Sequence, residues 1–231
     1  GKTTTIRLLL DLLRPSRGRV TVLGVDCHGQ SLEARRRIGY LPGAFPIYPD
    51  LTAEGYLRYL GQLDGRPVSP KYLDELLQRF DVSGTDLRRR LRDQSHGMKQ
   101  KIGIIQALMG HAPVLVLDEP TAGLDPLMVQ AFRDMLESLR KQGDTTVFLS
   151  SHVLTEVETT CDRVGVIRSG RLVATGTIAD LKHSAARRVT VEFREPVSVE
   201  LPAIPGAAIV NRSDRRWVLT MEGPAGPLLR A

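Results

Sequence analysis

The sequence predicts an α/β protein with a parallel sheet and a helical subdomain, followed by a small β-rich extension. Apolar runs at residues 114–117 and 146–149 have the length of strands buried on both faces. Strands alternate with helical patterns up to about residue 167, which is typical of a parallel sheet. From about residue 185, short alternating runs broken by proline and glycine replace this pattern. We therefore expect a main domain over 1–184 and an extension over 185–231, which we expect to be incomplete.

Local patterns predict the elements in order. A helix with apolar residues at Ile6, Leu9, Leu10 and Leu13 opens the chain, and a helix-rich insert extends from about Thr52 to Met109. Gly170 links two short β runs as a hairpin, and Thr177 starts a helix that ends near Lys182. The predicted strands are 19–23, 38–41, 114–117, 146–149, 163–168, 171–175, 189–193 and 217–221.

Composition limits the class of protein. With 231 residues and 42% hydrophobic content, the chain can bury one substantial core. No apolar run approaches the roughly 20 residues that a membrane span needs, and no signal-peptide pattern opens the chain, so we expect a cytosolic or peripheral protein. The net charge is +6, but the arginine triplets at 35–37 and 88–90 lack aromatic interleaving. No nucleic-acid partner is expected, and Cys27 and Cys161 are expected to be reduced thiols.

The stretch most indicative of function is Val114 to Asp125, an apolar strand that ends in two adjacent carboxylates. Asp118 and Glu119 follow the strand at the end where ligands of parallel sheets gather. Because adjacent carboxylates repel each other, we expect one to face a cation and the other to face water or a proton to be moved. A strand followed by a capped helix is the alternative that these two residues alone leave open.

The chain opens on Gly1-Lys2-Thr3, which matches the last three positions of the phosphate-binding loop G-x-x-x-x-G-K-[ST]. In a complete loop, backbone N–H groups surround the phosphates and Lys2 reaches the β- and γ-phosphates. The Thr3 hydroxyl then binds Mg²⁺ at a helix N-terminus. We therefore expect the chain to be truncated within this loop, and the absence of an initiator methionine supports that view.

A third segment, Asp93 to Lys101, has a cap-like opening and leads into a helix with apolar positions down to Met109. Ser95 and Gly97 therefore belong to the helix start. His96 lies between them and could touch phosphate, although we expect a solvated side chain.

Gln94 to Met98 resembles the Leu-Ser-Gly-Gly-Gln signature of ATP-binding-cassette (ABC) ATPases, and the other motifs follow in that family's order. The resemblance extends to about Leu181, and the variant signature together with residues 38–50 is similar to ABC-2 type exporter ATPases of the daunorubicin-resistance kind. It implies the P-loop NTPase fold. The matching segments are Gly1 to Thr4 for Walker A, Asp118 and Glu119 for Walker B, Ala122 to Asp125 for the D-loop, and Ser150 to His152 for the switch histidine.

The resemblance also implies roles for these residues. Gly1, Lys2, Thr3 and Thr4 would bind nucleotide, with Thr3 and Asp118 holding Mg²⁺ and Glu119 polarising the attacking water. His152 would contact the γ-phosphate. The remaining members would act across a head-to-tail dimer, in which Ser95 and Gly97 close over the partner's ATP and Asp125 joins the two sites. Capping of the next helix is the alternative for Asp125.

We therefore expect an ATP hydrolase that uses ATP and Mg²⁺ and pairs with a second, identical ATPase subunit. At the cytoplasmic face of the membrane, this pair would drive a separate ABC-2 type permease that exports a drug, a lipid or another small molecule. The alternative is a soluble cassette ATPase acting on ribosomes or DNA. The ribosomal type carries two cassettes in one chain, and the chromosomal type separates Walker A from the signature by long coiled coils. Here Lys2 and Ser95 are only 93 residues apart (95 minus 2). A degenerate cassette is disfavoured because Lys2, Asp118, Glu119 and His152 are all present.

One position departs from the family pattern. Pro42-Gly43 follows the strand at 38–41, where most cassette ATPases carry a glutamine. Gly43 has no side-chain oxygen, so a water or a backbone carbonyl would take the coordination position at Mg²⁺. The segment 44–59 could still dock a partner helix, and an ordinary proline-rich loop is the alternative.

The 231-residue chain itself should bind ATP poorly, because it lacks most of the N–H groups that surround the phosphates. Isothermal titration calorimetry measures this affinity directly. Micromolar binding by the chain as printed would contradict our account of the loop.

Overall fold

A computed structural model describes residues 1–43, 48–184, 187–195 and 207–221. The chain divides into two compact units, residues 1–160 and 161–231, and each is described by itself. The boundary between residues 184 and 185 that the sequence indicates falls inside the second unit and stays a prediction.

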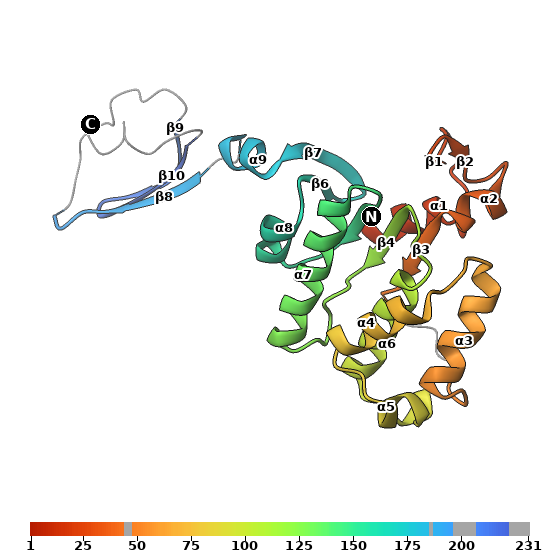
Figure 1. The fold of residues 1–231 in the computed structure, drawn as a ribbon. Helices are drawn as coiled ribbons and strands as arrows, with labels where there is room; N and C mark the ends of the chain where they lie inside the picture. The colour runs from red at the N-terminus through yellow and green to blue at the C-terminus, as the bar shows by residue number, and fades with distance from the viewer. Residues whose placement is uncertain (44–47, 185–186, 196–206, 222–231) are drawn as a thin grey trace. The chain divides into compact units, whose positions relative to one another are not determined.

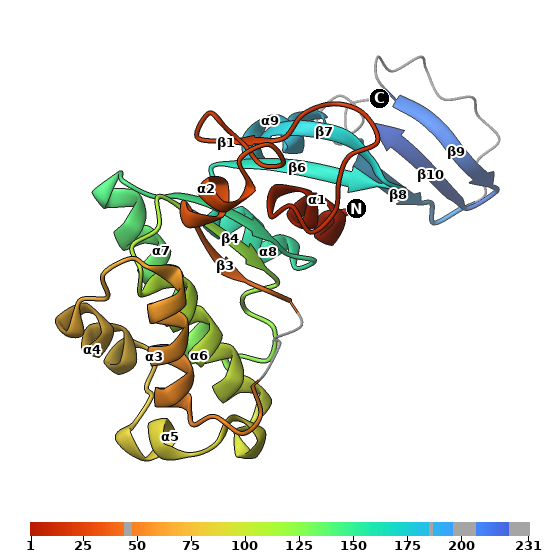
Figure 2. The ribbon, with the colours of Figure 1, turned by 90° about the vertical axis from the view of Figure 1, so that its right-hand side faces the viewer.

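A parallel sheet of three strands forms the centre of the first unit (Figures 1 and 2). The strands are β3 (Ile38–Leu41), β4 (Val114–Asp118) and β5 (Thr146–Ser150), with β4 in the middle. Every residue of β4 is buried, which confirms the predicted α/β class and the buried strand at 114–117. The expectation that 146–149 is also buried on both faces is wrong, because β5 is an edge strand of this sheet and Phe148 is 41% exposed.

Helices make up most of the remainder of the first unit. Four of them, α3 to α6, form the predicted helical subdomain, which Figure 2 shows grouped together beside β3 and β4. The helices are α1 (Lys2–Leu9), α2 (Ser31–Arg36), α3 (Ala53–Asp64), α4 (Pro70–Arg79), α5 (Gly84–Arg88), α6 (His96–Leu108), α7 (Pro126–Gln142) and α8 (Leu154–Thr160), with the short 3-10 helix η1 (Leu91–Asp93).

Local sequence explains where the helices of the subdomain begin. Each follows a serine or threonine whose hydroxyl accepts a hydrogen bond from the backbone N–H three residues later. These N-cap residues are Thr52, Ser69, Ser83 and Ser95. The helices are held by one apolar core, in which Phe80, Leu91 and Ile102 are fully buried.

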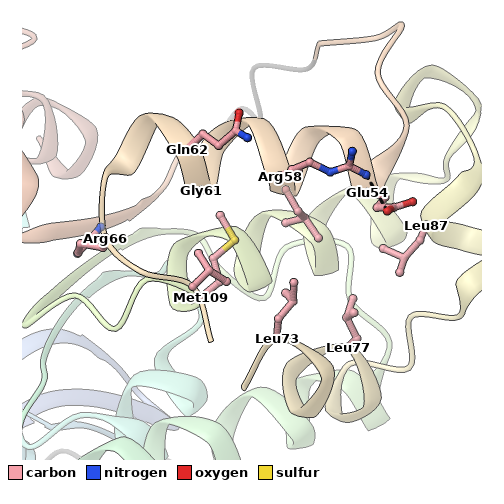
Figure 3. Close-up of a pocket in the computed structure, with 11 residues that line it drawn as sticks. Glu54, Arg58, Gly61, Gln62, Arg66, Leu73, Leu77, Leu87 and Met109 are labelled. Atoms are coloured by element: carbon pink, nitrogen blue, oxygen red, sulfur yellow. Dashed lines mark hydrogen bonds and ion pairs between the residues drawn. The ribbon is translucent and has the colours of Figure 1, made fainter. Parts of the chain in front are cut away.

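The helical subdomain also contains a cavity of about 400 Å³ between α3, α4, α5 and the end of α6. Figure 3 shows Leu73 and Leu77 of α4 pointing across this cavity toward Met109 and α3. Arg58 and Glu54 form an ion pair at its α3 side, with 2.8 Å between guanidinium nitrogen and carboxylate oxygen. No residue of the predicted catalytic or nucleotide-binding set lines the cavity.

The N-terminal part differs from the prediction in two places. Helix α1 ends at Leu9, because Asp11 takes a left-handed backbone conformation with a φ of 55°, and Leu13 lies outside the helix and is 41% exposed. The predicted strand at 19–23 is reduced to β1 (Thr21–Val22), which pairs with β2 (Val25–Asp26) as an antiparallel hairpin.

The second unit contains two antiparallel β structures. The predicted hairpin is confirmed as β6 (Arg163–Arg168) and β7 (Arg171–Thr177), and α9 (Ile178–Ser184) begins after Thr177 as expected. The extension forms a sheet in the order β8 (Arg187–Glu192), β10 (Arg216–Met221), β9 (Ala207–Ser213). Strand β9 was not predicted from the sequence. Its last three residues, Asn211 to Ser213, are all polar, so they do not show the alternation expected of a strand. The proline and glycine residues that break the alternating runs lie mainly in 196–206 and 223–227. These two ranges and part of the segment 44–59 lie outside the described residues.

The substitution Gly39→Ala should destabilise the first unit by about 1–3 kcal/mol, the usual cost of overpacking. A Cβ atom at Gly39 would lie 2.2 Å from the carbonyl oxygen of Ala107 and 2.7 Å from Leu115 Cδ2, so β3 and α6 would have to separate. Urea denaturation measures the change. In the control Gly84→Ala, the added Cβ would lie 3.5 Å from the flexible end of Arg88, so stability should stay equal or rise by about 0.4–1 kcal/mol. Equal stability of the two variants would contradict the close approach.

Candidate functional site

The two carboxylates expected at the end of the central strand are present, and their surroundings differ. Asp118 is the last residue of β4 and is only 5% exposed. Glu119 follows with a φ of 51°, a left-handed conformation that is uncommon for a residue other than glycine. Its backbone N–H donates to the carbonyl oxygen of Ser150 at 3.1 Å, so the turn after β4 is fixed against the end of β5.

Asp118 has a neutral hydrogen-bonding environment. Strand register places Ser150 directly opposite, and the Ser150 hydroxyl donates a hydrogen bond to the Asp118 carboxylate. Gly43 lies on the other side, where a Cβ atom would be 3.2 Å from the carboxyl group. The absence of a side chain at Gly43 therefore leaves space beside the carboxylate. Carboxylate, hydroxyl and water oxygens are the ligands that Mg²⁺ prefers, so the donor set fits that ion.

Glu119 is held by two basic side chains from distant parts of the chain. Lys2 Nζ lies 2.7 Å from Glu119 Oε1, and His152 Nδ1 lies 2.7 Å from Glu119 Oε2. The backbone N–H of His152 also donates to Oε2, at 3.3 Å. The fold thus brings together residues separated by 117 and 33 positions, and all three were expected at the site.

These partners determine the charge of Glu119. Partial burial by itself would raise the pKa of the carboxyl group. Hydrogen bonds from Lys2 and His152, together with their positive charge, outweigh burial and hold the pKa of Glu119 below its usual range. Glu119 is therefore an ionised carboxylate at neutral pH.

The remaining expected site residues lie at helix starts. Gly1 is the N-cap of α1 and provides no side-chain cap, while Thr3 and Thr4 are exposed in the first turn. The backbone N–H groups of this turn are thus available to an anion.

Two helix starts carry the residues expected to act across a dimer. Ser95 caps α6, and Gly97 lies so close to the loop after β4 that a Cβ atom would be 2.9 Å from the carbonyl oxygen of Gly123. Asp125 caps α7 and accepts a hydrogen bond from the N–H of Met128 at 2.9 Å. Capping, the alternative left open for Asp125, is thus the contact that this single chain makes. His96 is exposed, and its ring lies against Gly123.

Two polar residues of the site were not predicted from the sequence patterns. Gln100 is 4% exposed, and its amide donates to the carbonyl oxygens of Pro120 at 2.8 Å and Glu119 at 3.3 Å. Glu156 accepts hydrogen bonds from Thr121 Oγ1 at 2.7 Å and Ser151 Oγ at 3.3 Å, so it joins the loops after β4 and β5. The only sequence signal for Gln100 is its place between two lysines, which suggests an exposed position.

The part of the chain that the structure describes contains neither a cluster of metal-ligating side chains nor a helix that could cross a membrane. Over that part of the chain, no group of three or more His, Cys, Asp or Glu residues is placed to hold a metal ion. Within the same ranges, no helix combines the length and apolar character that crossing a membrane requires.

Comparison with known proteins identifies the family. The family model described as "ABC transporter" matches residues 1–122. The chain is 37% identical over 187 residues to the ABC transporter ATP-binding protein NatA of Bacillus subtilis (strain 168), covering 80% of this chain and 75% of NatA. The chain therefore belongs to the ABC transporter family, and the resemblance seen in the sequence is confirmed.

Two further relatives resemble the exporter type named from the sequence. The daunorubicin resistance ATP-binding protein DrrA3 of Streptomyces coeruleorubidus is 35% identical over 221 residues, with 94% of this chain and 69% of DrrA3 covered. The bacitracin transport ATP-binding protein BcrA of Bacillus licheniformis is 37% identical over 174 residues, covering 75% of this chain and 56% of BcrA. The chain spans only 51% and 56% of the lengths of the first two curated relatives it matches.

Solved structures agree with the fold. The ATP-binding subunit of an ABC transporter superposes with a TM-score of 0.70 at 32% identity, over 79% of this chain and 76% of that one. A dimeric ATP-binding cassette in a post-hydrolysis state, bound to ADP and Pi, superposes with a TM-score of 0.67 at 21% identity, over 77% and 81% of the two chains. The predicted P-loop NTPase fold is thus confirmed.

The substitution Lys2→Met should raise the pKa of Glu119, because the variant loses the hydrogen bond that contributes most to lowering this pKa. In the wild-type chain the lowered pKa means that ionised Glu119 stabilises the fold above the pKa of the unfolded chain. This contribution is lost as the pH falls through the lower, folded pKa. Titration of the Glu119 carboxyl carbon by NMR measures the shift. The control Lys141→Met, whose ammonium pairs with Glu137 at 3.6 Å, should leave Glu119 unchanged. An unmoved Glu119 in Lys2→Met would contradict the ion pair.

Proposed function

We propose that this chain is the ATP-hydrolysing part of an ABC transporter, and that its named site residues perform the hydrolysis. The observation that carries the proposal is the convergence of Lys2, Glu119 and His152 beside the buried Asp118. A phosphate-binding lysine, a carboxylate for Mg²⁺ and a residue that activates water are recurring parts of phosphoryl transfer to water, and the family resemblance adds the histidine.

The phosphates of ATP would lie against the first turn of α1. Gly1 and Thr4 supply backbone N–H groups there, and the positive end of the helix dipole favours the phosphate charge. Lys2 would exchange its contact with Glu119 for the β- and γ-phosphates. The exchange keeps the ammonium paired with an anion in both states, so it does not leave a charge without a partner.

Mg²⁺ would be held by the Thr3 hydroxyl and, through water, by Asp118. When bound, the ion supplies positive charge that offsets the charge developing on the phosphoryl oxygens. The carboxylate of Asp118 is oriented for this role by the Ser150 hydroxyl. Gly43, which lies beside this carboxylate, has no side-chain oxygen, so a water or a backbone carbonyl would replace the glutamine oxygen of most family members.

Glu119 would act as the general base on the attacking water, and His152 would contact the γ-phosphate. Release of Lys2 to the phosphates removes the largest influence that lowers the pKa of Glu119, so its carboxylate becomes a stronger proton acceptor when nucleotide arrives. His152 is mostly exposed and lies 2.7 Å from the carboxylate of the base, so its ring would be free to turn toward the γ-phosphate.

Two copies would close on two ATP molecules in a head-to-tail pair. Ser95 is exposed at the start of α6 and Gly97 follows in the first turn, so this helix start would face the nucleotide of the partner. Asp125 caps α7 and would also contact the partner. A two-fold pair makes each of these contacts twice, and the related cassette that is dimeric with ADP and Pi supports this arrangement.

The pair would drive a separate ABC-2 type permease from the cytoplasmic face of the membrane, and export is the direction that the relatives support. Their names assign one to daunorubicin resistance and one to bacitracin transport. Since the chain spans only part of those proteins, cargo and permease belong to the proposal for the whole protein. Co-purification of the full-length gene product with a membrane-embedded partner tests this part.

The variant Glu119→Gln should retain ATP binding and trap a dimer. Its rate of hydrolysis should fall by about 10²- to 10⁴-fold, the usual contribution of a general base. The full-length gene product is used, with phosphate release for turnover and light scattering for the dimer. Glu137→Gln is the control, because Glu137 lies on α7 in ion pairs with Arg140 and Lys141 outside the site. Undiminished turnover by Glu119→Gln would remove Glu119 from its role.

A further inference from the structure

The turn that carries Glu119 is tied to the start of helix α6 by a buried side chain that no motif includes. Gln100 projects from α6 and is 4% exposed. Its amide nitrogen lies 2.8 Å from the carbonyl oxygen of Pro120 and 3.3 Å from that of Glu119. A buried amide is costly unless it is hydrogen-bonded, so these two carbonyls determine where the Gln100 side chain can lie.

The turn needs such support. Glu119 has a φ of 51°, and a non-glycine residue keeps this sparsely populated conformation only where its surroundings impose it. On one side the N–H of Glu119 donates to Ser150, and within the turn Ala122 donates to the Glu119 carbonyl. For the Pro120 carbonyl, Gln100 is the donor that the described residues provide.

The same helix start touches the loop at a second place. Gly97 approaches the carbonyl oxygen of Gly123 so closely that a Cβ atom would be 2.9 Å away, and the ring of His96 lies against Gly123. Helix α6 therefore contacts both ends of the loop 119–123. Any shift of α6 would therefore move this loop and change the direction of the Glu119 side chain.

We propose that Gln100 is a positioning residue for Glu119, which holds the turn after β4 in place and ties the direction of the catalytic carboxylate to helix α6. The proposal rests on the proposed function, since it needs Glu119 as the base. It adds a physical link between the helix that begins at Ser95, assigned to the partner's ATP, and the base of its own chain.

The test compares Gln100→Leu with the wild-type full-length gene product. Leucine keeps most of the volume but donates no hydrogen bond, so the turn loses its support. We expect kcat to fall by about tenfold or more, because a misplacement of about 1 Å can cost about 10²-fold. KM for ATP should change little, since the groups that bind phosphate are untouched. The matched control is Ile104→Ala, a core change on the same helix, which should lower the melting temperature with a much smaller loss of kcat.

A second variant separates the hydrogen bond from packing. Gln100→Glu keeps the shape, but its carboxyl group donates a hydrogen bond only when protonated. The kcat of this variant relative to wild type should therefore rise as the pH falls, while the ratio for Gln100→Leu stays flat. If Gln100→Leu does not fold, this pH dependence alone decides.

Three results would overturn the inference: an unchanged kcat in Gln100→Leu, a loss no larger than that of Ile104→Ala, or a flat pH ratio for Gln100→Glu. The Glu119→Gln variant keeps the two proposals apart. An active Glu119→Gln removes the proposed function itself, whereas an inactive Glu119→Gln beside a normal Gln100→Leu removes only the role of Gln100.

Discussion

The candidate site depends on the pairing of β4 with its two parallel neighbours. This pairing brings the ends of β3, β4 and β5 to one edge of the sheet, so that Gly43, Asp118 and Ser150 meet. The apolar residues of β4 are buried against helices on both faces, and this burial fixes the position of the strand. The polar chemistry therefore rests on an apolar strand that is buried along its whole length.

Electrostatics then separates two carboxylates that are adjacent in the chain. Asp118 is buried and hydrogen-bonded to a neutral hydroxyl, whereas Glu119 points to a lysine and a histidine. The left-handed turn at Glu119 directs the two side chains to different partners. Two identical chemical groups can thus have separate tasks, one toward a metal ion and the other toward a proton.

Sequence patterns predicted the elements that local chemistry determines. The run Val114 to Leu117 and the cap-like start at Ser95 are recognisable without a fold, and the order of the motifs indicated Lys2, Glu119 and His152. The patterns failed where tertiary context decides. Nothing local distinguishes the buried Gln100 from the lysines beside it, because its burial depends on a turn 20 positions away. Likewise, the exposure of Phe148 follows from the place of β5 at the sheet edge.

The close approach at Gly39 has a mechanical consequence. With no side chain between them, the backbone of β3 lies directly on the backbone of α6 at Ala107. The C-terminal half of α6 and strand β3 are therefore packed backbone against backbone, with no side chain between them that could yield by changing its rotamer. Bending between the helical subdomain and the sheet would meet more resistance here than in the connections that lead into the other helices of the subdomain.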